Sequence, residues 1–464
     1  MKIEYILSTF EKKDWHLFGK FLSSPVFNQN LLLNRIFIFF RKNKNEKKNE
    51  INPKNLFQSV FPNEAFNRDQ LHYALGYFTR CTENYLAWDE WENDRDTQQL
   101  YLLRACRKRN IPQLFSSVFK KTQYLLQTAP RRDSHYYRLH YALEMEAYQQ
   151  GMYAGRSSAD QLQPLFHWHD VAFVAEKLRN ACLLLSRKKV QNVDLDTGLL
   201  PAVLDLVSHK KELLEYPAVA VYYHGYLTLS EPEKESHFFA LKNGLPSARE
   251  YFNADELRDI YLLATNFCIH RINLRQDAYL RELLELYQTG LSAGVFLENG
   301  FISRFTYTNI ALLALRMKEY QWGHDFIERW KDKLPETQRQ GAWALNLARY
   351  YCETGHFDLA MPLLQEMNSD DVLHNLMAKT MLLRMYYDTG AHNALQSLLD
   401  SFEAYLRRKR QMGNQQYTAY RNTIRFVRKM SRLPPGQKKA RHQLRSDIVA
   451  TELVAEKEWL LQRI

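Results

Sequence analysis

The chain has 464 residues, of which 45% are hydrophobic and 13% aromatic, with 16 Gly, 14 Pro and a net charge of +11. Its length exceeds what one compact core holds and its composition excludes long disordered stretches, so we expect several domains or an elongated helical array. The five cysteines lie far apart without a CxxC pair, which excludes a disulfide framework and a thiolate metal site.

The start of the chain does not have the pattern of a signal peptide. Glu4, Glu11 and Asp14 interrupt the apolar residues, and a cationic start followed by an apolar run is missing. The longest apolar cluster, Ile36 to Phe40, is far shorter than the roughly 20 residues that span a bilayer. We therefore expect a cytoplasmic protein without a membrane span.

Residues 1–95 predict a small helical N-terminal region, with helices over 14–22, 29–41 and 69–88. The last of these carries apolar residues at the three- and four-residue steps of a buried stripe. They are Leu71, Leu75, Phe78, Thr82, Tyr85 and Trp88. A boundary is predicted between residues 89 and 97.

Residues 96–304 predict irregular helical hairpins, with helices over 97–109, 112–127, 134–150, 171–189 and 218–229. Asn253 with Glu256 three positions later predicts a capping box at the start of a helix that reaches His270. The string from His167 to Asp170 (HWHD) could ligate a metal, but its place before a long helix favours Asp170 as an N-cap.

Residues 305–402 contain an internal repeat with a step of 35 to 37 residues, which is typical of tetratricopeptide-like helical pairs. In register, Lys318 aligns with Gly355 and Gly390, and four residues earlier Ala314 aligns with Tyr351 and Tyr386. We expect the two glycines to close the first helix of a pair at positive φ, and the aromatic residues to pack inside. The sequence therefore predicts an all-α fold, an α-solenoid of helical hairpins.

Residues 403–464 predict a basic helix and one capping helix over 437–464, which follows the break at 434–436. Thirteen Lys or Arg and no acidic residue lie between Ala404 and Ser446. Without those thirteen, the chain has 50 basic and 52 acidic residues, so this segment carries the whole positive excess. The candidate partner-binding residues are Arg407, Arg408, Lys409, Arg410, Arg421, Arg425, Arg428 and Lys429.

Two interpretations of this basic segment stay open. Clustered Lys and Arg attract nucleic acid or an acidic protein through counterion release and long-range steering. Alternatively, Tyr417, Tyr420, Ile424 and Val427 form an apolar stripe at helical spacing, and the cations occupy the solvated sides of the same helix.

Known catalytic signatures are missing from the sequence. Phosphate-binding and dinucleotide-binding glycine motifs, a GxSxG nucleophile elbow and an HExxH metal helix do not occur. We therefore expect a protein without enzymatic activity, cofactor or metal.

Several strings spread over the whole chain resemble a family of uncharacterised Bacteroidota proteins with tetratricopeptide-like helical repeats. These strings begin at Phe21 (FLSSPVFN), Leu229 (LSEPE), Asp255 (DELRD), Leu297 (LENG), Arg425 (RFVRK) and Glu458 (EWLL). The resemblance implies a helical-repeat fold in the bacterial cytoplasm and carries over no catalytic residue.

These observations predict a helical-repeat scaffold that binds a protein or peptide partner through the concave surface of the solenoid. The alternative is a nucleic-acid-binding repeat protein that uses the basic C-terminal segment, in which Tyr405, Tyr417 and Tyr420 lie among the cations.

Overall fold

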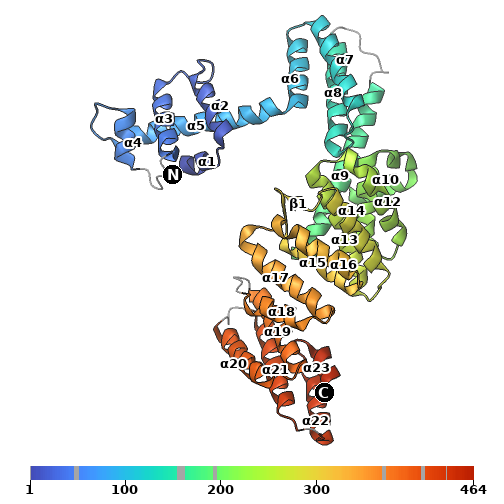
Figure 1. The fold of residues 1–464 in the computed structure, drawn as a ribbon. Helices are drawn as coiled ribbons and strands as arrows, with labels where there is room; N and C mark the ends of the chain where they lie inside the picture. Colours follow the sequence, from blue (N-terminus) through green and yellow to red (C-terminus); the bar gives the residue numbers. More distant parts are fainter. Residues whose placement is uncertain are drawn as a thin grey trace. The chain divides into compact units, whose positions relative to one another are not determined.

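The computed structural model describes residues 2–45, 52–153, 162–191, 196–367, 372–408, 413–434 and 436–464. These residues form helices and one short two-stranded hairpin (Figure 1). The all-α prediction is therefore confirmed. None of the described helices combines the length and the hydropathy needed to cross a membrane.

The chain divides into two compact units. The first holds residues 1–130 and 134–173, and the second holds residues 131–133 and 174–464. The finer four-part division into 1–95, 96–304, 305–402 and 403–464 stays a prediction.

The first unit contains nine helices or parts of helices among its described residues. They are α1 (Lys2–Ser8), α2 (Lys12–Ser23), α3 (Leu31–Asn45), α4 (Pro53–Val60), α5 (Arg68–Asn93), α6 (Arg95–Lys108), α7 (Pro112–Thr128), α8 (Ser134–Tyr153) and the first part of α9 (Leu162–Gln191).

The predicted apolar stripe of α5 is buried. Leu71, Phe78 and Tyr85 pack in the core of the N-terminal helices, and the ring centroids of Tyr85 and Phe18 lie 5.0 Å apart. This helix continues to Asn93, past the predicted start of the boundary.

The second unit holds the rest of α9 and all later elements. Its described part up to the short hairpin contains α10 (Leu200–His209), the 3-10 helix η2 (Lys211–Glu215), α11 (Pro217–Ser230), α12 (Glu235–Tyr251), α13 (Ala254–Asn273), α14 (Tyr279–Ser292), β1 (Leu297–Glu298) and β2 (Phe301–Ile302). After the hairpin follow α15 (Arg304–Arg316), α16 (Tyr320–Trp330), the 3-10 helix η3 (Lys331–Lys333), α17 (Glu336–Glu353), α18 (Phe357–Gln365), α19 (Val372–Asp388), α20 (His392–Arg408), α21 (Asn414–Ser431), α22 (Lys438–Ala450) and α23 (Lys457–Arg463).

Successive helices of the second unit pack as pairs: α11 with α12, α13 with α14, α15 with α16, α17 with α18 and α19 with α20. We call the leading member of each pair a first helix. First helices also contact one another, α11 with α13, α15 with α17, and α17 with α19. Asn253 accepts a hydrogen bond from the Glu256 amide at the start of α13, which confirms the predicted N-cap. The reciprocal half of the predicted capping box is not formed, because the Glu256 carboxylate accepts from the Asn253 side-chain amide at 3.1 Å and not from its backbone.

The aligned repeat positions form the same turn three times. Lys318, Gly355 and Gly390 have φ values of 60°, 82° and 69°. In each case the amide of the following residue donates to the carbonyl five residues back, which is the bond of a Schellman motif. The acceptors are the aligned residues Ala314, Tyr351 and Tyr386, at 2.9, 2.8 and 2.9 Å.

The same turn also closes α13, upstream of the predicted repeat. Arg275 has a φ of 63°, and the Gln276 amide donates to the Arg271 carbonyl at 3.1 Å. The glycine pattern did not reveal this turn because an arginine occupies the left-handed position.

A β-hairpin with two residues in each strand separates α14 from α15. It was not predicted. Asn299 and Gly300, with φ values of 51° and 83°, connect β1 to β2. An Asn-Gly pair is a strong signal for such a turn, since both central residues need positive φ.

The prediction of one capping helix over 437–464 was wrong. Two helices, α22 and α23, occupy this segment, and Glu456 between them has a φ of 57°. Side chains of α21 hold the intervening backbone: Asn422 donates to the Leu453 carbonyl at 2.8 Å and Thr423 to the Ala455 carbonyl at 2.6 Å.

Asp170 is not an N-cap, contrary to the prediction. It lies inside α9, which already begins at Leu162. Pro164 occupies the first turn of this helix, where a missing backbone N–H costs no intrahelical hydrogen bond.

Candidate functional site

The basic C-terminal segment is built on α20 and α21, which pack against each other. One face of α21 is buried, with Ile424 and Val427 as predicted from their spacing, and with Phe426 and Met430 beside them. Because this apolar face points inward, the arginine-bearing sides of α21 face outward.

Four of the eight predicted residues lie at the end of α20 and just beyond it. Arg407 and Arg408 are exposed in the last turn of α20. Lys409 and Arg410 lie outside the described residues.

The other four predicted residues lie on α21, where neighbouring helices neutralise two of them. Arg428 forms ion pairs with Asp400 at 2.8 Å and with Glu403 at 3.0 Å, both on α20. Lys429 lies 4.0 Å from Asp447 of α22. These two cations therefore tie helices together, which an acid-free stretch of sequence does not reveal.

An open groove of about 410 Å³ lies along α21, and we call it the α21 groove. Its lining consists of Glu403, Arg421, Ile424, Arg425, Arg428, Lys429 and Arg432. Within the described part of the chain, the side chains of Arg421, Arg425 and Arg432 form no ion pair. The net charge of the groove is positive, and three of its arginines are available to a ligand.

A second group of polar side chains lies on successive first helices and was not predicted. The Arg349 guanidinium on α17 donates to Asn346 Oδ1 at 3.2 Å and lies 3.1 Å from the sulfur of Met377 on α19. The buried Asn346 also donates to Thr308 Oγ1 on α15 at 3.1 Å. These contacts join α15, α17 and α19. With His374 of α19, we call Thr308, Asn346, Arg349 and Met377 the Arg349 cluster.

The Arg349 cluster disfavours positive charge. Burial lowers the pKa of Arg349, and burial together with the charges of Arg304 and Arg349 lowers the pKa of His374. Among the described residues, no carboxylate pairs with the Arg349 guanidinium. A carboxylate bound beside Arg349 would favour the charged form of its guanidinium, since an opposite charge favours the charged form of a base.

Lys379, farther along α19, has a similar environment. Burial and then the charge of Arg408 lower its pKa, and its ammonium lies 5.6 Å from the centre of the Tyr405 ring. The Tyr405 hydroxyl is buried and has no hydrogen-bond partner among the residues that the structure describes.

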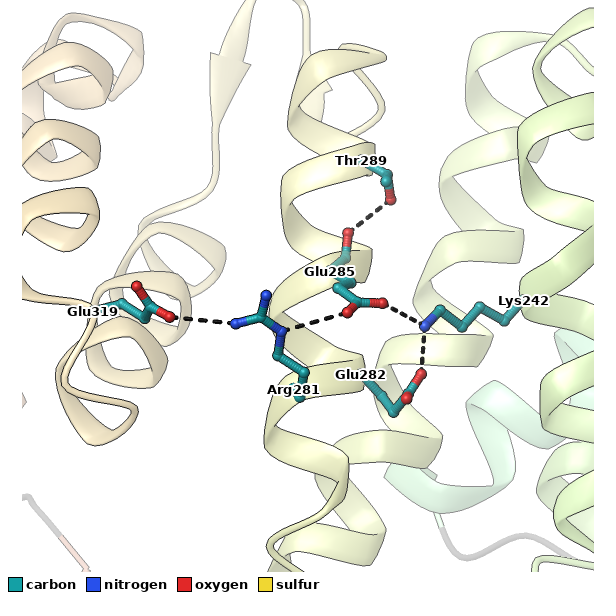
Figure 2. A network of polar contacts seen from close by, with 6 residues as sticks. All are labelled: Lys242, Arg281, Glu282, Glu285, Thr289 and Glu319. Carbon is teal, nitrogen blue, oxygen red and sulfur yellow. Dashed lines mark hydrogen bonds and ion pairs between the residues drawn. The ribbon is translucent and has the colours of Figure 1, made fainter.

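Figure 2 shows the opposite arrangement on α12, α14 and the turn before α16. Lys242 of α12 pairs with Glu282 and, at 2.7 Å, with Glu285 of α14. Arg281 lies 3.4 Å from Glu285 and 3.3 Å from Glu319, which immediately precedes α16. We call these five residues the charge ladder. In it, every cation has a carboxylate on a neighbouring helix pair.

The candidate metal string of the sequence lies on α9 and makes aromatic contacts. The ring of Trp168 stacks on His140 at 4.2 Å between centroids, and His169 lies edge-on to Tyr141 at 5.0 Å. Across the described ranges, no group of three His, Cys, Asp or Glu side chains is placed to hold a metal ion.

Comparison with protein-family models, with curated proteins and with solved structures finds no match to this chain. The assignment of a function therefore depends on the contacts and charges described above.

Proposed function

We propose that this protein is a non-enzymatic helical-repeat scaffold that binds an acidic segment of a protein partner along α15, α17 and α19. The repeated pairs and the recurring turn support an α-solenoid, in which the first helices line the concave side. Such a surface is suited to an extended or helical peptide.

The observation that carries the proposal is Arg349. Leaving a charged group partly out of water without a counter-charge costs several kcal/mol in a protein interior, although less here because the side chain keeps some exposure. Its guanidinium has only an amide oxygen and a thioether as partners in the described structure. A carboxylate supplied by a partner would give this arginine the bidentate contact that its planar fork favours.

The test is affinity capture from the native host with mass spectrometry, using the native protein, Arg349→Gln and the control Arg329→Gln. Arg329 is exposed on α16 and does not contact the Arg349 cluster. We expect at least one partner to be lost with Arg349→Gln and kept with Arg329→Gln, and its acidic segment to bind as a synthetic peptide. Identical partner sets for all three proteins would reject the proposal.

Nucleic-acid binding through the α21 groove is a second candidate, and the unpaired Arg421, Arg425 and Arg432 favour it. Three phosphate contacts would give a slope of about −2.7 in a plot of log affinity against log salt concentration for duplex DNA. Retention on RNA or DNA should therefore fall with salt and fall further in the variant with Arg421, Arg425 and Arg432 replaced by Glu. Lack of retention at low salt would remove this candidate.

We also propose a cytoplasmic location. The five cysteines, all within the described ranges, are not joined in disulfides, and four of them are buried, as is usual for proteins of reducing compartments. Fractionation of the native host tests this, and recovery outside the cytoplasm would contradict it.

A further inference from the structure

A groove of about 460 Å³ lies in the first unit, between α2 and α3. On α2 it is lined by His16, Gly19, Lys20 and Ser23, with Ser24 just after the helix. On α3 it is lined by Asn34, Phe37, Ile38 and Arg41. Both sets follow the steps of three and four residues that place side chains on one face of a helix.

The two helices run antiparallel and approach closely. Lys44, near the end of α3, donates to the Phe10 carbonyl just before α2. A Cβ at position 19 would lie 3.2 Å from two ring carbons of Phe37, so Gly19 allows the ring to form the floor of the groove. The groove is therefore part of the packing of this helix pair.

The lining has cations but no acids. Lys20, Arg41 and His16 are exposed, and none of the three has an ion pair or hydrogen-bond partner among the described residues. The antiparallel course brings His16 of α2 to the same end of the groove as Arg41 of α3. This distribution differs from that of the α21 groove, where Glu403 already neutralises one arginine.

The rest of the groove offers hydrogen bonds and an apolar wall. Ser24 and Asn34 carry a hydroxyl and an amide that no described residue uses, and Ile38 is 63% exposed. A bare anion would fill only part of a space of this size, which is in the range of small-molecule sites. The geometry fits a charged group at one end and a less polar body along Phe37 and Ile38.

We propose that the groove between α2 and α3 binds a phosphate monoester. Near neutral pH this group carries a charge of about −1.5 to −2 and three acceptor oxygens, which suits a lysine and an arginine without other partners. The ester could be a soluble metabolite of nucleotide size or the headgroup of a lipid, because both present the same chemistry.

Calorimetric titration of the full chain with inorganic phosphate, adenosine 5′-monophosphate and adenosine tests the soluble source. Sedimentation with phosphatidylcholine vesicles, with and without phosphatidic acid, tests the lipid source. The variant pair is Lys20→Gln with Arg41→Gln. The matched control is Lys13→Gln with Lys42→Gln, which removes two exposed cations of the same helices that do not line the groove.

We expect adenosine 5′-monophosphate, or vesicles that contain phosphatidic acid, to bind at least about tenfold more tightly than adenosine or plain vesicles. Binding should weaken by about tenfold or more for the groove variant and stay unchanged for the control. Binding of the nucleotide alone identifies the soluble source, and binding of the vesicles alone identifies the lipid source. Equal loss in both variants, or no binding of any phosphate probe at low salt, would overturn the proposal. Neither result would affect the proposed function of the second unit.

Discussion

Two regions of the second unit treat their charged side chains in different ways. From α9 to α14, cations meet carboxylates of neighbouring helices: Arg179 pairs with Glu256 at 2.8 Å, and Lys242 pairs with Glu282 and Glu285. From α15 to α19, Arg349 has no such partner among the described residues. We call the first stretch the paired region and the second, after Arg349 alone, the unpaired region; other cations of the second stretch do pair, such as Lys331 with Glu328 at 2.7 Å.

The difference separates stabilising contacts from available ones. Removing one member of a buried pair leaves the other charge without compensation, so the paired region depends on its ions for stability. Removing a buried charge that has no partner instead removes the free-energy cost of taking that charge out of water, so stability is kept or increased. A cation that lowers stability and is nevertheless present is a better candidate for binding than a cation in the charge ladder.

The largest expected effect comes from opening the most buried pair of the paired region. Glu256→Ala should lower the free energy of unfolding by about 3 kcal/mol, because Arg179 and the Tyr222 hydroxyl lose their shared acceptor. Burial and then the charge of Asp133 raise the pKa of Glu256, whereas Arg179 and the Tyr222 hydroxyl oppose this shift. Urea denaturation measures the change, with the exposed Glu250→Ala as control. Equal stability of the two variants would contradict the assignment.

The paired region also contains a contact between two histidine rings that disfavours their protonated forms. His224 of α11 and His237 of α12 lie 3.1 Å apart between their Nδ1 atoms, with one ring donating and the other accepting. Burial and the neighbouring His237 lower the pKa of His224 to about 4, and burial lowers that of His237.

Stability should therefore fall as the pH is lowered from about 6.5 to 4. In this window an unfolded chain, with a histidine pKa of about 6.5, binds a proton that folded His224 rejects. We expect a loss of about 2 kcal/mol, measured by urea denaturation across the window. His224→Gln should reduce the loss, whereas the exposed His442→Gln should not. An unchanged pH dependence in His224→Gln would reject this role for the pair.

A smaller effect compares the two regions directly. Lys242→Met should destabilise the protein by about 1 kcal/mol, because the partly exposed Glu282 and Glu285 lose their shared cation. Arg349→Met should leave stability within about 0.5 kcal/mol of the native value or raise it. Burial lowers the pKa of Arg349, which means that its charged form is disfavoured in the folded protein, and the substitution removes that cost. Thermal melting of both variants gives the measurement. A larger loss for Arg349→Met would show that this arginine serves stability.

The fold could be predicted from the sequence where local signals dominate. The helix-spaced apolar stripes of α5 and α21 and the Asn253 cap are confirmed. Errors arose where a tertiary contact decides the backbone, as in the break between α22 and α23 that Asn422 and Thr423 stabilise.

The sites were less predictable because pairing joins residues far apart in the chain. The acid-free run contains Arg421 and Arg425, which are exposed, but also Arg428, which pairs with residues 25 and 28 positions earlier. The Arg349 cluster has only a weak local signal, an Asn and an Arg three residues apart on a helix whose first turns also carry polar residues. Their importance comes from α15 and α19, which the local sequence does not contain.

The smallest expected effect concerns the turn where the unpaired region begins. Lys318 has the left-handed conformation that glycine provides at the two later turns, and left-handed backbone costs an ordinary residue about 1 to 2 kcal/mol. Lys318→Gly removes this strain but also makes the unfolded chain more flexible, so we expect a net stabilisation of about 0.5 kcal/mol. Gly355→Ala should destabilise the protein instead. The new Cβ would meet no neighbouring atom within 4 Å, but an alanine at a φ of 82° is strained. Thermal melting distinguishes the two signs. If both substitutions destabilised the protein, the lysine side chain would have to stabilise this turn by more than the strain costs, and the turns would not be equivalent.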